Sequence, residues 1–176
     1  MVRLGEHDLG CLEGSEQLRL AGRLIRHPGY NRLTKEHDLM LVKLRRAAVP
    51  GPSVQPLGLS TSCPAPGTPC LVSGWGTTRS PQRAFPRVLH CANVTVLECR
   101  GAYPQLATPG MVCAAGAGTP PADACQGDSG GPLVCGGRLQ GIVSWGPEIC
   151  GDPRRPGVYV NVCRYGRWIR ETMRRN

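Results

Sequence analysis

Residues 123 to 135, "DACQGDSGGPLVC", place Ser129 among glycines, between acidic residues and two cysteines. A serine hydroxyl alone is a weak nucleophile and needs an adjacent general base before it attacks a carbonyl group. Glycines let the backbone turn, so that the N–H groups of Gly127 and Ser129 could face a developing oxyanion. The stretch therefore indicates acyl-transfer chemistry, although a Gly-Asp-Ser-Gly string by itself is also typical of a simple turn.

The composition indicates a disulfide-bonded protein made mainly of short strands. The length of 176 residues suits one ordinary domain, and two lobes also fit within it. Gly and Pro are abundant, and short apolar runs alternate with turn residues, so we expect an all-β fold. Ten cysteines without a Cys-x-x-C pair or a Cys/His metal spacing predict disulfides in an oxidising compartment, and no metal or other cofactor.

Several segments have the pattern of strands. The segment 16–25, "EQLRLAGRLI", alternates so that Leu18, Leu20 and Leu24 share one parity, which predicts a half-buried strand. Gly136-Gly137 predicts a two-residue hairpin. Further strands are expected at 37–44, 70–76, 89–97, 131–135, 138–145 and 157–162.

Only the C-terminal tail has a helical pattern, with Tyr165, Trp168, Ile169 and Met173 on one face. The Pro-rich run 63–70, "CPAPGTPC", is interpreted as a connection between two strand-rich halves.

The formal net charge of +9 could attract polyanions or acidic proteins. No recognition helix or aromatic-rich pattern accompanies this charge, so we interpret it as a solvated basic face and expect no nucleic-acid partner. The first residues, "MVRLGEHDLG", lack the features of a signal peptide, and no apolar run is long enough to span a bilayer.

Several motifs occur together and in order: "SGWG" at 73–76, the Ser129 segment, "GIVSWG" at 141–146, "PGVYVNVC" at 156–163 and "YGRWIRETM" at 165–173. Together they resemble the chymotrypsin-clan, or trypsin-like, serine proteases. "VRLGEHDL", "HPGYN", "HDLML" and "LHCANVTV" look most like the tissue-kallikrein-related branch. The resemblance covers nearly the whole chain.

The resemblance implies two antiparallel six-stranded β-barrels, an active site in the cleft between them, and a C-terminal α-helix. On this basis residues 1–176 are one protease domain that lacks its N-terminal part. Residues 1–62 would be the remainder of an incomplete first barrel, 63–163 the second barrel, and 164–176 the helix. The resemblance also implies a secreted monomer.

Roles follow residue by residue from the resemblance. Ser129 matches the nucleophile and Asp38 matches the aspartate that orients the catalytic histidine. Gly127 and Ser129 match the oxyanion donors. Asp128 matches the acidic residue that pairs with the freed mature N-terminus and so orders the oxyanion loop.

The general base should be a histidine, and the chain has His7, His27, His37 and His90. None occupies the family's place for it, an "AAHC" segment well upstream of the aspartate. His90 lies after Asp38, and His37 adjoins Asp38, where neighbouring strand residues point to opposite faces. We therefore expect a catalytically inactive chain whose sequence is N-terminally truncated, as a splice form or an incomplete gene model would be.

The resemblance also predicts trypsin-like specificity. Asp123 matches the carboxylate at the base of the specificity pocket, and Gly146 and Gly157 match small residues that keep the pocket open. Ala124 stands where a serine is often found, so an ammonium group loses a hydrogen-bond acceptor while a guanidinium can still bind the carboxylate bidentately. Cleavage after Arg in preference to Lys is therefore expected.

The substrate-binding residues implied are Asp123, Ala124, Gln126, Ser144, Trp145, Gly146 and Gly157. The expected partners are proteins or peptides with Arg or Lys at the cleavage site, and proteinaceous serine-protease inhibitors.

The resemblance implies four disulfides, and they are Cys63–Cys163, Cys70–Cys135, Cys99–Cys113 and Cys125–Cys150. Cys11 and Cys91 are then expected to be free thiols. Asn93-Val94-Thr95 is a glycosylation sequon, which can be used only in the secretory route.

An alternative function is that of a non-catalytic protease homologue, or an inactive fragment, that binds partners through the remaining cleft. Retention of Ser129, Asp38 and Asp123 favours descent from an active enzyme.

Overall fold

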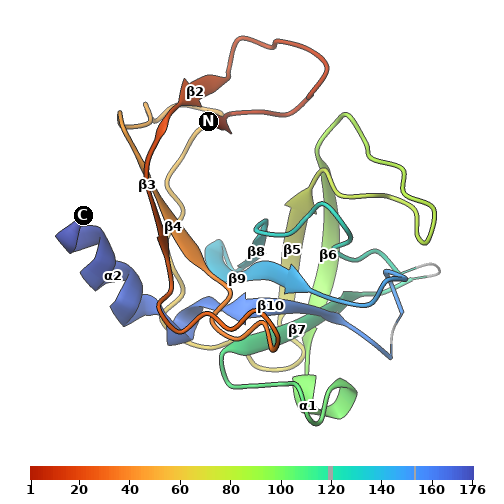
Figure 1. The fold of residues 1–176 in the computed structure, drawn as a ribbon. Coiled ribbons are helices and arrows are strands. Elements are labelled where there is room, and N and C mark those ends of the chain that lie inside the picture. The colour runs from red at the N-terminus through yellow and green to blue at the C-terminus, as the bar shows by residue number, and fades with distance from the viewer. Residues whose placement is uncertain (119–120, 153) are drawn as a thin grey trace.

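The computed structural model of the chain describes residues 1–118, 121–152 and 154–176. Its centre is a closed antiparallel barrel with the strand order β10-β7-β6-β5-β8-β9 (Figure 1). The strands are β5 (Pro69–Gly74), β6 (His90–Leu97), β7 (Met111–Gly116), β8 (Pro132–Cys135), β9 (Arg138–Trp145) and β10 (Gly157–Asn161). Closure of the barrel pairs both edges of the sheet, so these strands present no free edge.

The barrel interior is filled by alternating apolar side chains. Its core includes Val72, Val94, Leu133 and Tyr159, with the Cys70–Cys135 disulfide joining β5 to β8. The turn between β8 and β9 is formed by Gly136 and Gly137 at φ of 56° and 72°, which confirms the predicted hairpin. The predicted all-β class is confirmed.

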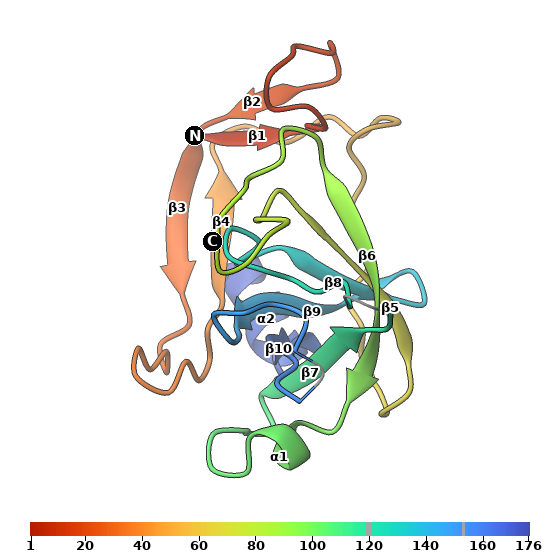
Figure 2. The same cartoon turned by 90° about the vertical axis from the view of Figure 1, so that its right-hand side faces the viewer.

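The N-terminal region forms two separate two-stranded sheets. They pair β1 (Val2–Leu4) with β2 (Gln17–Arg19), and β3 (Ala21–Arg26) with β4 (Met40–Leu44). Figure 2 shows these sheets beside the closed barrel. The single strand predicted over 16–25 is therefore wrong: the chain changes partner after β2.

The face of this segment predicted to be buried is in fact exposed. Leu18, Leu20 and Leu24 are 54%, 56% and 63% exposed. A two-stranded sheet buries a face only against another layer, and within the described part of the chain no layer covers this one. Alternation in the sequence does not say whether another layer covers the apolar side chains.

The other side of the β3–β4 hairpin packs on the C-terminal segment. Leu39, Tyr165 and Ile169 are buried together, and Leu41 and Trp168 pack against them. The predicted C-terminal helix is present as α2 (Gly166–Arg175), after a short 3₁₀ turn, η1 (Val162–Arg164). This contact attaches the N-terminal hairpin to the barrel.

Four described elements were absent from the sequence prediction: β1, β7, η1 and the single-turn helix α1 (Cys99–Ala102). Helix α1 is capped by the Glu98 side chain and tethered by the Cys99–Cys113 disulfide. None of the helices in the described ranges has both the length and the apolar character required to cross a membrane. The proposed domain boundaries stay a prediction.

Candidate active site

The candidate catalytic residues Asp38 and Ser129 are attached to neighbouring residues of strand β9. Asp38 lies just before β4, and its Oδ2 accepts a hydrogen bond of 2.7 Å from the Ser144 hydroxyl. The residue after Ser129, Gly130, donates its N–H to the Val143 carbonyl at 2.8 Å. Because Val143 and Ser144 are adjacent, β9 brings these two distant parts of the sequence to one place.

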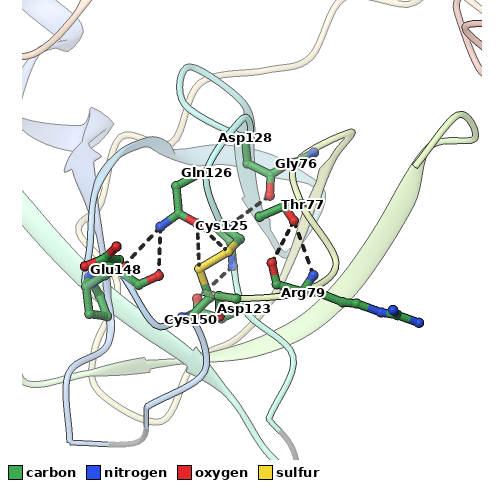
Figure 3. Close-up of a disulfide and its surroundings, with 12 residues drawn as sticks. Gly76, Thr77, Arg79, Asp123, Cys125, Gln126, Asp128, Glu148 and Cys150 are labelled. Atoms are coloured by element: carbon green, nitrogen blue, oxygen red, sulfur yellow. Dashed lines mark hydrogen bonds between the residues drawn. A yellow bond between two sulfur atoms is a disulfide. The ribbon is translucent and has the colours of Figure 1, made fainter. Parts of the chain in front are cut away.

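The loop before Ser129 is fixed by the carboxylate of Asp128. Its Oδ1 accepts the Gly76 N–H at 2.7 Å and its Oδ2 accepts the Cys125 N–H at 2.9 Å (Figure 3). A Cβ atom on Gly74 or Gly76 would overlap this carboxylate. The two glycines of the "SGWG" motif are therefore required by the approach of Asp128.

The backbone at Gly127 and Ser129 suits the binding of an anion. Gly127 has φ of 103°, a conformation that favours glycine, and a Cβ there would lie 3.0 Å from Gly76 Cα. Within the described part of the chain, the N–H groups of Gly127 and Ser129 have no hydrogen-bond acceptor. Two free N–H groups beside an exposed serine hydroxyl can donate to an oxyanion.

Asp123 is a largely buried carboxylate without a cationic partner among the described residues. Its Oδ1 accepts the Ala124 N–H at 2.8 Å, whereas its Oδ2 has no hydrogen-bond partner in the described ranges. Burial raises the pKa of Asp123 to about 6, although backbone N–H groups of Ala124, Gly151 and Gly157 act in the opposite direction. An unpaired buried carboxylate of this kind can receive a cation.

Gly157 lies against Asp123, and Gly146 lies close to Gly157. A Cβ on Gly157 would lie 3.0 Å from Asp123 Oδ1 and 3.5 Å from the Tyr159 hydroxyl, and one on Gly146 would lie 3.7 Å from Gly157 Cα. The Tyr159 hydroxyl is buried without a partner among the described atoms, and burial raises its pKa. Tyr159 was not predicted as a site residue. The one sequence feature that could have indicated this role is its position two residues after Gly157 on β10.

A cavity of about 720 Å³ lies beside both acidic residues. Asp123 and Asp128 line it, together with residues 76–80, the start of β6 at His90 and Cys91, and residues 149–152. It therefore extends from the candidate specificity carboxylate to the carboxylate that fixes the Ser129 loop.

Three other expected substrate-binding residues have structural contacts of their own. The Gln126 side chain donates to the Pro147 and Glu148 carbonyls at 3.3 and 3.1 Å (Figure 3). Trp145 packs edge-on against Tyr103, with ring centroids 4.9 Å apart. Ala124 packs against the barrel core. These contacts hold the loop before Ser129 and the end of β9 in fixed positions.

Comparison with known proteins agrees with this geometry. The sequence profile of the family described as Trypsin matches residues 1–169. This chain belongs to the trypsin family. Kallikrein-15 of Saguinus oedipus is 51% identical over 99% of this chain and 73% of its own length. Kallikrein-14 of Homo sapiens is 49% identical over 98% of this chain and 66% of its own length.

A solved structure also superposes on nearly the whole trypsin-family chain. It is that of neuropsin, a serine protease expressed in the limbic system of mouse brain, with a TM-score of 0.91 and 48% sequence identity. The match covers 97% of this chain and 78% of neuropsin. Kallikrein-5 of Homo sapiens is 49% identical, and this chain spans 60% of its length.

Of the four histidines of this trypsin-family chain, His27 and His37 have side-chain partners, whereas the contacts of His7 and His90 are made by the backbone. His27 and His37 stack with ring centroids 4.7 Å apart, and His37 Nδ1 lies 3.0 Å from the Tyr165 hydroxyl. The His7 carbonyl accepts the Trp75 indole N–H, and His90 pairs with Gly74 in the barrel. Among the described residues, none of the four has a hydrogen bond to Asp38 or Ser129.

The structure corrects one reason given for setting His37 aside. His37 does not lie in a strand, because β4 begins at Met40, and its φ is 55°. His37 and Asp38 instead have different partners, since His37 Nδ1 lies beside the Tyr165 hydroxyl and Asp38 Oδ2 accepts from Ser144.

All four expected disulfides are present in the trypsin-family structure. Cys11 and Cys91 are free and exposed, as expected. Asn93 is exposed on β6, so the sequon is accessible, although its glycosylation stays a prediction.

Three carboxylates, those of Glu6, Glu13 and Glu16, converge in the loop between β1 and β2, and sequence analysis did not single them out. Each accepts a backbone N–H from this loop, and Glu6 also pairs with Arg3. These bonds give the cluster a structural role in closing the loop.

Proposed function

We propose that this chain is the substrate-binding and nucleophile-bearing part of a secreted serine endopeptidase that cleaves proteins after Arg in preference to Lys. Ser129 is the nucleophile, Asp38 orients the catalytic histidine, and the N–H groups of Gly127 and Ser129 bind the oxyanion. One observation supports the proposal above all: Asp38 and the Ser129 loop are both hydrogen-bonded to neighbouring residues of β9. The four disulfides and the exposed Asn93 support secretion.

The environment of Asp123 supports specificity for a basic side chain. Its unpaired Oδ2 suits a cation, the glycines at 146 and 157 place no side chain beside it, and Arg can bind the carboxylate bidentately. Ala124 provides no hydroxyl, so a Lys ammonium has one acceptor fewer. Inhibitor proteins that present Arg or Lys would bind in the same way.

Asp128 is proposed to pair with a free α-amino group in an activated form of the enzyme. Two backbone N–H groups already bind its carboxylate, and the adjoining cavity has space for a chain end. Such an ion pair would hold the backbone of Gly127 and Ser129 in the oxyanion-binding conformation.

The test of the proposed function is hydrolysis of matched Arg and Lys peptide amides by an extended form that carries a kallikrein-like N-terminal segment past "AAHC". We expect turnover with a higher kcat/KM for the Arg peptide. Ser129→Ala should abolish turnover without changing the thermal melt. An equal or higher kcat/KM for Lys would overturn the specificity, and no turnover with either peptide would overturn the proposed catalysis.

The second candidate function is binding without catalysis, favoured by one observation. In the described part of the chain, none of the four histidines has a hydrogen bond to Asp38 or Ser129. A folded extended form that binds an Arg-presenting inhibitor, but hydrolyses no peptide, would favour this alternative.

A further inference from the structure

The C-terminal helix α2 presents a row of arginines that the proposed active site does not use. Arg167, Arg170 and Arg174 are exposed and spaced three and four residues apart, so they lie on one side of the helix. The helical rise places the first and last of them about 10 Å apart. Arg175 is also exposed at the end of α2.

The β3–β4 hairpin extends this positive surface. Arg23 on β3 and Lys43 on β4 are paired in register and exposed, on the same side of the sheet as Leu41, which packs toward α2. The Arg23 guanidinium donates to the Asn176 side chain at 2.8 Å, directly after α2. We call the set Arg23, Lys43, Arg167, Arg170, Arg174 and Arg175 the basic face.

Few negative charges oppose the basic face. Glu171 is the one acidic side chain of α2, and it pairs with Arg167 at 2.8 Å. The pKa of Glu171 is lowered first by the hydrogen bond from Arg167, and further by the charges of Arg175 and Arg174. In the described part of the chain Arg170, Arg174 and Arg175 have no ion pair.

We propose that the basic face binds a linear sulfated polysaccharide. Arginine is weakly hydrated and presents a planar fork that matches the oxygens of a sulfate group. A row of guanidinium groups along a helix fits an extended chain of anions and not a single ion. The surface lies outside the active site, so this binding adds to the proposed proteolysis and does not depend on it.

Other polyanionic partners fit the basic face less well. Trp168, the aromatic residue of α2, packs against the core, so α2 offers no exposed ring on which a nucleic-acid base could stack. The apolar side of α2 is buried against η1 and the hairpin except at Met173, so the helix offers a lipid surface only a single exposed apolar side chain. The four disulfides indicate an oxidising compartment, where sulfated polysaccharides are the common linear polyanions.

The experiment compares two triple variants of the full chain, each with three positive charges removed. One is Arg167→Gln, Arg170→Gln, Arg174→Gln on the basic face. The control is Arg79→Gln, Arg83→Gln, Arg100→Gln at exposed positions away from α2. Affinity for a heparin dodecasaccharide is measured by titration at several salt concentrations, with duplex DNA and unsulfated hyaluronan as further probes.

We expect the basic-face variant to bind heparin at least about tenfold more weakly, and its log–log salt slope to fall by about three, one for each lost contact. The control should change affinity by less than about twofold, hyaluronan should not bind, and both variants should keep the wild-type melting temperature. Equal losses in the two variants would overturn the site. DNA bound as tightly as heparin through the same arginines would overturn the assignment to a sulfated polysaccharide.

Discussion

At the scale of single residues, Asp123 links specificity to pH. Its folded pKa of about 6 exceeds its ordinary value of 3.8, so between these values the folded state binds more protons than the unfolded state. The free energy of unfolding therefore falls as pH rises from 3.8 to 6, and the penalty is complete above pH 6. A bound cation would offset this penalty, because it pairs with the ionised carboxylate.

We predict that binding of an aromatic amidine weakens as pH falls through about 6, where Asp123 becomes protonated. Asp123→Asn should abolish this binding and raise the free energy of unfolding at neutral pH by on the order of 1 kcal/mol. Amidine fluorescence and urea titrations measure the two effects. Glu148→Gln, a nearby change at an exposed side chain, should alter neither, and amidine binding that survives in Asp123→Asn would contradict the role of this carboxylate.

Ala124 gives a second prediction at the same scale. In the extended form, Ala124→Ser should raise the Lys:Arg ratio of kcat/KM about two- to tenfold, since one hydrogen bond to the ammonium is gained. Glu148→Gln again serves as the control and should leave the ratio unchanged. A ratio that stays constant would show that Ala124 does not set the preference.

At the scale of elements, the Ser129 loop depends on the end of β5. We predict that Gly76→Ala lowers the free energy of unfolding by about 1–3 kcal/mol, because its Cβ would overlap the Asp128 carboxylate. The matched control is Gly101→Ala in α1, where a Cβ meets no atom within 4 Å. Urea titration should show little or no loss of unfolding free energy for Gly101→Ala. An unchanged free energy of unfolding in Gly76→Ala would argue against the fixed position of Asp128.

The sequence predicts elements that local residues define, and it misses elements that form only through pairing with other strands. The predicted strand 138–145 coincides with β9, because Gly136-Gly137 defines where that strand begins. Strand β7, "MVCAAG", was missed because its Ala and Gly residues are weak strand formers, and it is formed by pairing with β6 and β10.

The residues of the candidate site also differ in how far the local sequence predicts them. Ser129 and Asp123 are apparent from a short motif. The Tyr159 hydroxyl in the pocket depends on which face of β10 turns inward, and this is a property of the closed barrel and not of local sequence.

At the scale of the whole molecule, the uncovered face of the N-terminal sheets should govern solution behaviour. Leu24 and Val42 are paired across β3 and β4 and are both exposed. Exposed apolar strands with free edges favour self-association. We predict that Leu24→Lys with Val42→Thr raises the monomer fraction at high concentration by about twofold or more, without lowering the melting temperature by more than about 2 °C.

Sedimentation over a range of concentrations measures this effect. Replacement of the exposed Leu57 by Lys, away from β3 and β4, serves as the control and should not change the monomer fraction. Equal monomer fractions in the double variant and the wild type would show that this face does not drive association.

The central claim is that these 176 residues hold the nucleophile and the specificity carboxylate but not the general base. The most direct measurement is hydrolysis of an Arg-amide by oxidatively refolded, monomeric chain beside its Ser129→Ala variant. Loss of a catalytic histidine lowers kcat by roughly a million-fold in a comparable triad, so we predict equal and negligible rates. Turnover by the chain that disappears in Ser129→Ala would contradict the account.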